Sequence, residues 1–490
     1  MTSSTPEHVD VVIIGAGLSG IGAACHLRTE CPDRTFVILE ARGVSGGTWD
    51  LFRYPGVRSD SDMFTLSYPF RPWLDAKAIA EGPAILTYLR ETARENGIEE
   101  KIRYHRRVRH ASWSSAQARW TVEVEHLDPA GKPLGTEQLT CAFLWGNTGY
   151  YRYDEGYTPA FEGIADFAGT IVHPQHWPDD LDVTGRRVIV IGSGATAVTL
   201  IPALAQDAAQ VTMLQRSPSY VVSLPERDRL AEVLRRHLPA TLVYRVVRSK
   251  NVLLTMLNYQ ASRRFPTLMK SVLRKGVERQ LPAGYDIDTH FTPRYQPWDQ
   301  RLCVAPDGDL FQSIRTGRAV VVTDRLERFT EKGVRLTSGT ELEADVIVTA
   351  TGLNLLLFGG VTLDIDGTPV DLSQHVGYKG IMFSEIPNLA VTLGYTNASW
   401  TLKGDLTARW VCRLLNRMAA NGYHRVIPAS PDPSLPTRPF IDLTSGYVQR
   451  SRGALPQQGI TGPWRLHQNY PRDVLLLRFG GVADEMLEFS

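Results

Sequence analysis

The sequence predicts an α/β fold, because two glycine-rich turns and one further apolar strand recur along the chain. VDVVIIGAGLSGIGAACHL, from Val9, and RRVIVIGSGATAVTLIPALA, from Arg186, each run from an apolar strand through a glycine turn into a helical pattern. ADVIVTATGLN, from Ala344, adds a third apolar strand that ends in small residues. Strands that alternate with helices in this way are typical of α/β proteins.

The first turn carries the spacing of a dinucleotide-binding site. Gly15 permits the tight turn, Gly17 lets a pyrophosphate approach the backbone, and Gly20 lets the helix pack close to the strand. The next strand, TFVILE, ends in Glu40, whose carboxylate can accept hydrogen bonds from both ribose hydroxyls of an adenosine. We therefore expect a bound dinucleotide here, the alternative being a glycine turn without a ligand.

The second turn repeats this spacing with Gly192, Gly194 and Ala197. Its following strand, VTMLQRSPSY, ends in Arg216 and Ser217 instead of an acid. Arginine and a hydroxyl bind the 2′-phosphate of NADP through charge-assisted hydrogen bonds, whereas a carboxylate repels it. The sequence therefore predicts NADP at this turn, unless Arg216 is only a solvated surface charge.

Composition indicates a globular, intracellular protein. The 490 residues are 43% hydrophobic and 21% charged, with a formal net charge of +1 that gives no sign of nucleic-acid binding. No secretory signal precedes the first strand, so we expect a cytoplasmic protein. Neither the cysteines nor the histidines show metal-ligand spacing, so no metal is predicted. The five cysteines are Cys25, Cys31, Cys141, Cys303 and Cys412.

The chain carries one glycine turn whose following strand ends in an acid and another whose following strand ends in arginine. This combination resembles the flavoproteins that bind two dinucleotides. The resemblance implies two Rossmann-like domains, with FAD in the first and NADPH in the second. The FAD domain would be discontinuous, with residues 1–150 as its first part and residues 352–490 as its return segment and C-terminal region. The NADP domain would occupy residues 151–351.

FAGTIVHPQHWP, residues 167–178, lies between the two turns and is too broken by proline and histidine to suggest a regular helix or strand. It matches the FxGxxxHxxxW[P/D] fingerprint of type I Baeyer–Villiger monooxygenases, class B flavoprotein monooxygenases. In that family the segment links the two domains. The resemblance implies packing roles for the aromatic and proline residues and a polar contact, responsive to cofactor state, for the histidine. The matching residues are Phe167, Gly169, His173, Trp177 and Pro178.

Further stretches resemble the subgroup of mycobacterial ethionamide-activating monooxygenases. They are GGTWDLFRYPGVRSDSD (46–62), PRYQPWDQRLCVAPDGDLF (293–311), ATGLNLLLFGG (350–360) and GYTNASWTLK (394–403). The similarity implies that NADPH reduces FAD and that molecular oxygen then forms a C4a-peroxyflavin. That species would insert one oxygen atom into a ketone, giving an ester or lactone, or oxygenate a sulfide or thioamide.

The same resemblance assigns the catalytic pair. Arg301, in DQRLC, matches the arginine whose permanent charge stabilises the flavin-bound oxygen, and Asp60 matches the aspartate that positions it. Arg58 and Asp62 are nearby alternatives for this pairing. The loop of Gly47, Thr48 and Trp49 matches the segment beside the flavin and its phosphates, with core packing as the alternative for Trp49.

Two features depart from a plain match. Gln300 stands where many members of the family carry lysine, which leaves Arg216 and Ser217 with more of the 2′-phosphate and implies a weaker preference for NADPH. Residues 226–279 contain thirteen Lys or Arg and four Asp or Glu, within a predicted helical insert at about 226–290 of the NADP domain. The insert is either a solvated helical face or a surface that meets an anionic membrane or a partner. Nucleic acid is the remaining alternative, and no interleaving of aromatic and basic residues favours it.

Three other functions share parts of this pattern. An N-hydroxylating flavin monooxygenase would also use two dinucleotides but is not expected to carry the full fingerprint at 167–178. A reductase that uses FAD and NADPH would need a redox dithiol, and no CxxC or CxxxxC pair occurs. A nucleotide-binding or redox-sensing module without enzymatic activity is the third, and it would show no NADPH-dependent oxygen uptake.

Overall fold

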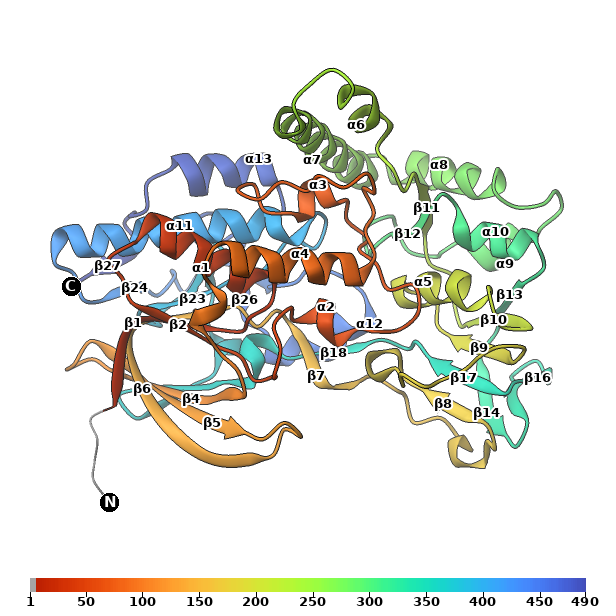
Figure 1. Ribbon diagram of the computed structural model, residues 1–490, viewed down its shortest axis with the longest axis horizontal. Helices are drawn as coiled ribbons and strands as arrows, with labels where there is room; N and C mark the ends of the chain where they lie inside the picture. The colour runs from red at the N-terminus through yellow and green to blue at the C-terminus, as the bar shows by residue number, and fades with distance from the viewer. Residues whose placement is uncertain (1–5) are drawn as a thin grey trace.

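The computed structural model describes residues 6–490, which form two main sheets placed side by side (Figure 1). The first sheet has nine strands in the order β20-β19-β4-β5-β6-β1-β2-β3, and β23 also pairs with β6. β1 lies between β2 and β6 and is parallel to both. The strands are β1 (Glu7–Ile14), β2 (Phe36–Leu39), β3 (Ile102–Arg103), β4 (Arg106–Ser114), β5 (Arg119–Leu127), β6 (Pro133–Gly146), β19 (Thr362–Ile365), β20 (Thr368–Val370) and β23 (Leu389–Val391).

The second sheet has five parallel strands in the order β13-β10-β9-β17-β8. Its central strands are buried on both faces, which explains their continuous apolar sequences. Helix α5 (Ala195–Leu204) follows β9 directly and packs near β10 and β12 (Cys303–Pro306). The strands are β8 (Thr170–Val172), β9 (Arg187–Ile191), β10 (Gln210–Gln215), β13 (Ala319–Thr323) and β17 (Val346–Thr349).

Two connecting segments run between the sheets and pair with each other. The outgoing segment forms β7 (Tyr151–Gly156) and the returning segment forms β18 (Leu353–Leu355), antiparallel to it. The chain therefore leaves the first sheet, builds the second, and comes back to complete the first with β19, β20 and β23.

The predicted α/β fold with two Rossmann-like sheets is confirmed. One local prediction is wrong: Thr170–Val172, within FAGTIVHPQHWP, form strand β8 at the edge of the second sheet, where they pair with Val346–Val348 of β17. A three-residue edge strand needs only one partner, so the proline and histidine that follow do not prevent it. The domain boundaries at about 150 and 352 stay a proposal.

Helices cover the first sheet and extend from the second. The first sheet is covered by α1 (Leu18–Glu30), α4 (Gly82–Glu95) and α11 (Trp400–Asn421), whose buried residues join those of β1 in one core. Three helices of the insert, α6 (Arg229–Leu234), α7 (Ala240–Arg264) and α8 (Pro266–Glu278), lie on the outside of the molecule, at the top of Figure 1. α7 contacts the first part of the chain through α3 (Met63–Leu66).

Candidate active site

A cavity of about 1130 Å³ brings together residues that the sequence separates widely. Its lining combines the first glycine turn, Glu40, the loop at residues 46–49, Asp60 and Arg301. It also receives side chains from Tyr150–Asp154 and from the start of α11. Ligand pockets usually measure about 300–1000 Å³, so a cavity of this size can hold a dinucleotide with room beside it.

The first glycine turn has the backbone geometry of a dinucleotide cradle. Gly15 has φ +99°, and a Cβ there would lie 2.8 Å from the carbonyl oxygen of Asn147. A Cβ on Gly20 would overlap the carbonyl oxygen of Gly15. At Gly17, by contrast, the nearest atom to such a Cβ is the Cα of Gly47 at 3.5 Å. The first and third glycines are therefore required by the fold itself, and the second leaves space toward the cavity.

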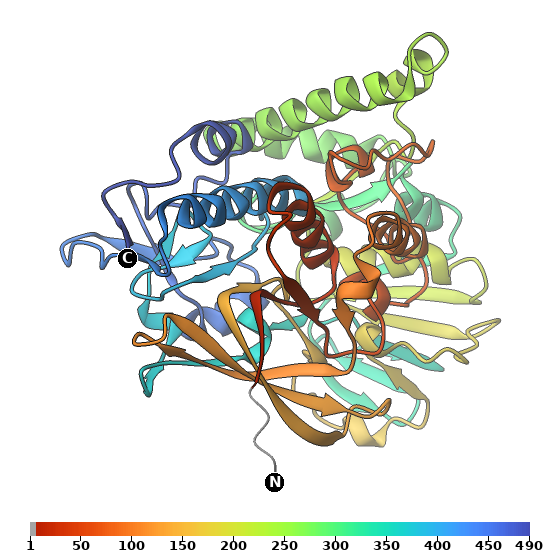
Figure 2. The ribbon, with the colours of Figure 1, turned by 60° about the vertical axis from the view of Figure 1, so that its left-hand side comes forward.

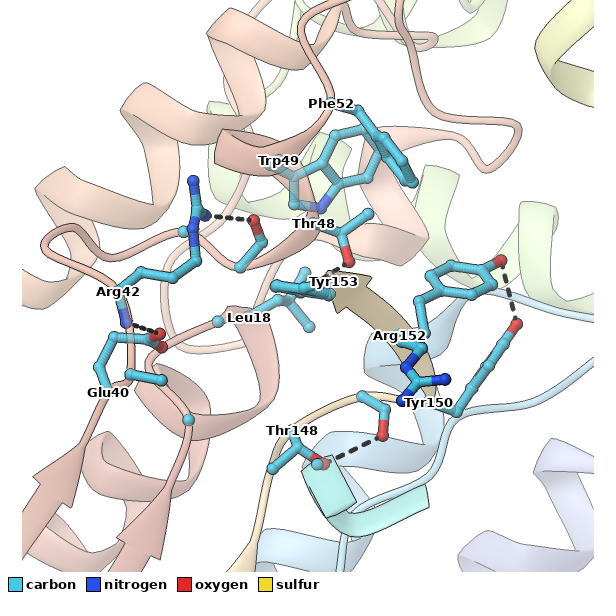
Figure 3. A pocket seen from close by; sticks show the side chains of 18 of the residues that line it. Leu18, Glu40, Arg42, Thr48, Trp49, Phe52, Thr148, Tyr150, Arg152 and Tyr153 are labelled. Atoms are coloured by element: carbon cyan, nitrogen blue, oxygen red, sulfur yellow. Dashed lines mark hydrogen bonds between the residues drawn. The ribbon is translucent and has the colours of Figure 1, made fainter. Parts of the chain in front are cut away.

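Glu40 lies at the end of β2 and closes one end of this cradle. Its carboxylate accepts hydrogen bonds from the backbone N–H groups of Ala16 (2.8 Å) and Arg42 (2.9 Å). Burial nevertheless raises the pKa of Glu40 above its ordinary value. Each carboxylate oxygen keeps a second lone pair, which a ribose hydroxyl can use. Figure 3 shows Glu40 and Tyr150 at opposite sides of the pocket, with Thr48, Trp49 and Tyr153 between them.

The loop of Gly47, Thr48 and Trp49 lies against the first turn. Gly47 has φ +56°, and a Cβ there would stand 3.0 Å from the Cα of Gly17. The Thr48 hydroxyl contacts the Tyr153 hydroxyl at 3.2 Å, as Figure 3 shows. Trp49 is half-buried, because one face of it packs on the core and another lines the cavity. Both interpretations of Trp49, packing and ligand contact, are therefore compatible with its position.

Arg301 lines the same cavity inside a ring of tyrosines. Its Nη2 donates to the Tyr150 hydroxyl at 3.4 Å, and its buried Nε has no hydrogen-bond partner within residues 6–490. Tyr150, Tyr447, Tyr151 and Asp60 raise the pKa of Arg301 above its ordinary value, against the effect of burial. The guanidinium thus keeps its charge at the wall of the cavity.

Asp60 faces this cavity without forming an ion pair with Arg301 at 4.0 Å or less. Burial raises the pKa of Asp60 to about 6, although the charges of Arg301 and Arg58 oppose the shift. Arg58 instead binds Asp309, with 2.6 Å between Nη1 and the carboxylate. Asp62 caps α3 by accepting from the backbone N–H of Thr65 at 3.1 Å. Arg58 and Asp62 therefore each have another partner, although the charge of Arg58 still acts on Asp60, and Asp60 is a carboxylate whose charge acts on Arg301.

The second glycine turn lies between β9 and α5. Gly192 has φ +141°, and a Cβ there would overlap the carbonyl oxygen of Ala350. Gly194 has open space around it, since no described atom lies within 4 Å of the position of its Cβ. Ala197 is fully buried in the core beneath the turn. This geometry fits a second dinucleotide, with Gly194 as the point of closest approach.

Arg216 and Ser217 follow the end of β10, at the same edge of the sheet as this turn. Both are exposed, and the Arg216 side chain has no hydrogen-bond or ion-pair partner in the described part of the chain. Ser193, between the two glycines of the turn, donates to the carbonyl oxygen of Ser217 at 2.9 Å. This hydrogen bond links the glycine turn, which would hold the diphosphate of NADP, to Arg216 and Ser217, which would hold its 2′-phosphate.

His173 joins the two connecting segments. Its Nδ1 accepts from the backbone N–H of Gln175 at 3.2 Å, so the proton is on Nε2, which donates to the carbonyl oxygen of Gly352 at 3.2 Å. Burial lowers the pKa of His173, so the neutral ring is favoured. The imidazole also packs so closely on Gly156 that no Cβ would fit there. A movement of β18 relative to β7 would therefore disturb this histidine.

The other fingerprint residues pack around the second sheet. Phe167 is buried against Phe329, with ring centroids 6.3 Å apart. A Cβ on Gly169 would stand 2.6 Å from the carbonyl oxygen of Asp345, so this position requires glycine. Trp177 is half-buried against the core beneath α5, and Pro178 follows it at the surface of that core. The fingerprint thus positions β8 and His173 and does not line the cavity.

Sequence reasoning missed the tyrosines of the cavity. Tyr150 contacts Arg301, packs on Trp400 with centroids 5.2 Å apart, and meets the Tyr151 hydroxyl at 3.4 Å. Tyr447 joins them from a short helix near the C-terminus. Only GYY at 149–151, directly after an apolar strand, could have drawn attention to this group.

Residues 6–490 offer neither a cluster of metal ligands nor a helix that could span a membrane. Among residues 6–490, no group of three or more His, Cys, Asp or Glu side chains could hold a metal ion. No helix in this part of the chain is long and apolar enough to cross a bilayer.

Comparison with known proteins identifies the family. Residues 67–422 match the flavin-binding monooxygenase-like family, and residues 13–77 match an NAD(P)-binding Rossmann-like domain. The chain is 56% identical to the FAD-containing monooxygenase EthA of Mycobacterium tuberculosis over 99% of its own length and 98% of that protein. It is 46% identical to the probable FAD-binding monooxygenase AlmA of Acinetobacter baylyi, with 99% and 96% covered.

Solved structures with the same fold are more distant in sequence. A steroid monooxygenase bound to NADP superimposes with a TM-score of 0.76 at 20% identity, covering 98% of this chain and 99% of that one. A cyclohexanone monooxygenase superimposes with a TM-score of 0.74 at 19% identity, covering 99% and 100%. The family match and the full-length relatives confirm the resemblance that the motifs indicated. The chain therefore belongs to the flavin-binding monooxygenase-like family and is a flavoprotein monooxygenase.

Proposed function

We propose that this chain is a Baeyer–Villiger monooxygenase that uses FAD, NADPH and molecular oxygen. It would insert one oxygen atom into a ketone to give an ester or lactone, and would oxygenate sulfides or thioamides. The observation that carries the proposal is the position of Arg301, a permanent cation that lines the same cavity as the first glycine turn and Glu40. An N-hydroxylating monooxygenase is the alternative, and the full fingerprint at 167–178 argues against it.

The residues of the cavity fit FAD. Gly15, Gly17 and Gly20 with the start of α1 would hold the pyrophosphate, and Glu40 the ribose. Gly47, Thr48 and Trp49 would lie along the remainder of the cofactor. Bound FAD, once reduced by NADPH, supplies the redox chemistry that activates oxygen.

The protein contributes binding, charge and the exclusion of water. Arg301 would hold a developing negative charge without releasing a proton, because guanidinium does not titrate at physiological pH. Tyr150 orients one edge of that guanidinium, and Trp400 packs behind Tyr150. Arg216 and Ser217 would bind the 2′-phosphate of NADPH beside Gly192, Gly194 and Ala197. Cytoplasmic localisation, with or without contact at a membrane surface, also stays a prediction.

The predicted substrate scope includes sulfur as well as ketones. Attack on a carbonyl requires a nucleophilic oxygen donor, which loses strength on protonation, whereas attack on a sulfide requires an electrophilic one. Turnover of methyl phenyl sulfide is therefore expected to fall less steeply than turnover of a ketone as the pH decreases. Product identification by chiral chromatography, across cyclic ketones, linear ketones, aryl sulfides and thioamides, measures this. Ketone oxidation without any sulfide or thioamide product would refute the sulfur part.

At about pH 8 the melting temperature of Asp60→Asn is expected to equal or exceed that of the wild type. The yield of oxygenated product is expected to fall in the same variant. Because burial raises the pKa of Asp60 to about 6, the folded chain binds more protons than the unfolded chain between the ordinary pKa and that value. Wild-type stability should therefore decrease as the pH rises through this window, and the amide should remove that dependence. Thermal melts at several pH values test this.

Asp62→Ala is the matched control for Asp60→Asn, because Asp62 caps α3 and its loss should cost about 1 kcal/mol. It should lower the melting temperature at neutral pH. If Asp60→Asn lowered it equally and kept full product yield, Asp60 would be a structural residue rather than the partner of Arg301.

A further inference from the structure

The inner face of α7 is fixed to the first part of the chain. Arg248 is buried there, and its Nη1 donates to the carbonyl oxygens of Phe64, Thr65 and Ser67 at 2.6–3.2 Å. Tyr244 lies beside it and contacts the Ser67 hydroxyl at 3.1 Å. These contacts set the rotation of α7 about its axis, and so decide which of its residues face outward.

The outer face of α7 and α8 is apolar. Leu242, Val246, Leu253 and Leu257 recur at spacings of four and seven residues, so they form one stripe along α7. Phe265, between the two helices, and Leu268 and Val272 on α8 are exposed as well. These seven residues, the outer stripe, each keep 40–61% of their surface exposed. Single exposed apolar side chains are normal on a protein surface, but an aligned series of this length marks an interaction surface.

The same two helices carry only positive charge apart from Glu278, the last residue of α8. No Asp or Glu occurs from Ala240 to Val277. Arg245, Arg264, Lys270 and Lys275 have no ion-pair partner within residues 6–490. Glu278 and the three acids that precede α7 are all ion-paired. Their ion pairs are Glu226 with Lys77, Asp228 with Lys250, Glu232 with Arg227, and Glu278 with Arg274.

A second apolar group lies near one end of α7. Leu475, Leu476 and Phe479 belong to the short helical segment Val474–Phe479 and are 65%, 43% and 69% exposed. Figures 1 and 2 both show α13 (Tyr470–Asp473), which leads directly into this segment, beside an end of the long helix α7.

We propose that the outer stripe, with Arg264 and Lys275 near it, both unpaired within the described residues, docks on the surface of an anionic lipid bilayer. Apolar side chains along a helix with basic residues beside them are typical of helices that lie in the headgroup region. The charge argues against a second copy of this chain as the occupant, because two such faces would bring unpaired arginines and lysines together. The helices would lie on the membrane rather than cross it, in agreement with their composition.

Vesicle flotation tests the docking. The full-length holoenzyme is expected to float with vesicles of phosphatidylcholine and phosphatidylglycerol, and not with phosphatidylcholine alone, and to dissociate as salt is added. L253E/L257E should weaken binding at least about tenfold, and R264E should weaken it about fivefold or more. L134E/V320E is the matched control, since Leu134 and Val320 are exposed but lie on β6 and β13. This control should bind as the wild type does.

A label on the stripe provides a second readout. All five native cysteines are buried, so a cysteine introduced at the surface can be labelled selectively. A polarity-sensitive dye on L257C or L268C should shift to the blue when phosphatidylglycerol vesicles are added, and the same dye on L134C should not. Wild-type binding by L253E/L257E would overturn the proposal. So would an unshifted dye at both stripe positions, or concentration-dependent dimerisation that buries them without vesicles.

Discussion

Replacing Arg301 by alanine is expected to abolish nearly all product formation while the protein stays folded and yellow. The residues proposed to hold FAD, from Gly15 to Glu40, belong to another segment and make no contact that depends on this side chain. What disappears is the fixed positive charge in the cavity. Loss of one such electrostatic contact commonly lowers the rate by about 10²- to 10³-fold. NADPH oxidation should continue, with hydrogen peroxide in place of oxygenated product.

Three measurements on the same samples make this result specific. Flavin content comes from absorbance, electron use from NADPH consumption, and the branching from product and peroxide yields. Arg294→Ala is the control, because Arg294 is exposed, belongs to the same segment and should leave coupling unchanged. Arg301→Lys should recover only part of the yield, since lysine presents a point charge without the planar fork. A normal product yield in Arg301→Ala would show that another group stabilises the charge.

The two glycine turns could be predicted from sequence because their requirements are local. Gly15 and Gly192 need a positive φ that other residues rarely adopt, and Gly20 packs against Gly15 only a few residues away. The strands before them are buried on both faces, so their apolar runs are continuous. The α/β fold therefore follows from short segments of sequence.

The surroundings of Arg301 could not be predicted in the same way. Tyr150 and Tyr447 lie far from Arg301 in sequence, and only the folded chain brings the three side chains together. The Asp60 pairing was inferred from a family resemblance, and spacing alone did not distinguish it from Arg58 or Asp62. Their partners, Asp309 and the N-terminus of α3, come from tertiary packing and local capping. Strand β8 was missed because its only neighbour is the distant β17.

The geometry of His173 suggests how the fingerprint acts without lining the cavity. Its ring links the outgoing segment at Gly156 to the returning segment at Gly352. Gly352 closes the turn that begins with Ala350, and Ala350 in turn packs on Gly192 of the second cradle. A ligand that displaces the second glycine turn would therefore also displace Ala350. Gly352 is only two residues further on, so its hydrogen bond to His173 would change. This supports a coupling role for the fingerprint rather than a chemical one.

Arg216→Ala is expected to weaken NADPH binding by about 10- to 150-fold, the equivalent of roughly 1.5–3 kcal/mol for lost charge-assisted hydrogen bonds. Arg216 is exposed and has no partner within residues 6–490, so its removal should not destabilise the fold. NADH lacks the 2′-phosphate and should bind almost as before. The ratio of KM values for NADPH and NADH, with kcat measured alongside, reports this loss directly.

Arg186→Ala is the matched control for the Arg216 prediction, because both arginines are exposed and flank parallel strands of one sheet. β9 and β10 are parallel, and Arg186 precedes β9 whereas Arg216 follows β10. The two arginines therefore lie at opposite ends of the strands, and only Arg216 lies at the carboxyl end, where the glycine turn is. Gln300→Lys should act in the reverse direction and tighten NADPH binding, since it adds a cation where relatives carry one. A wild-type KM for NADPH in Arg216→Ala would refute the assignment, and the 2′-phosphate would then have to be held by a residue other than Arg216.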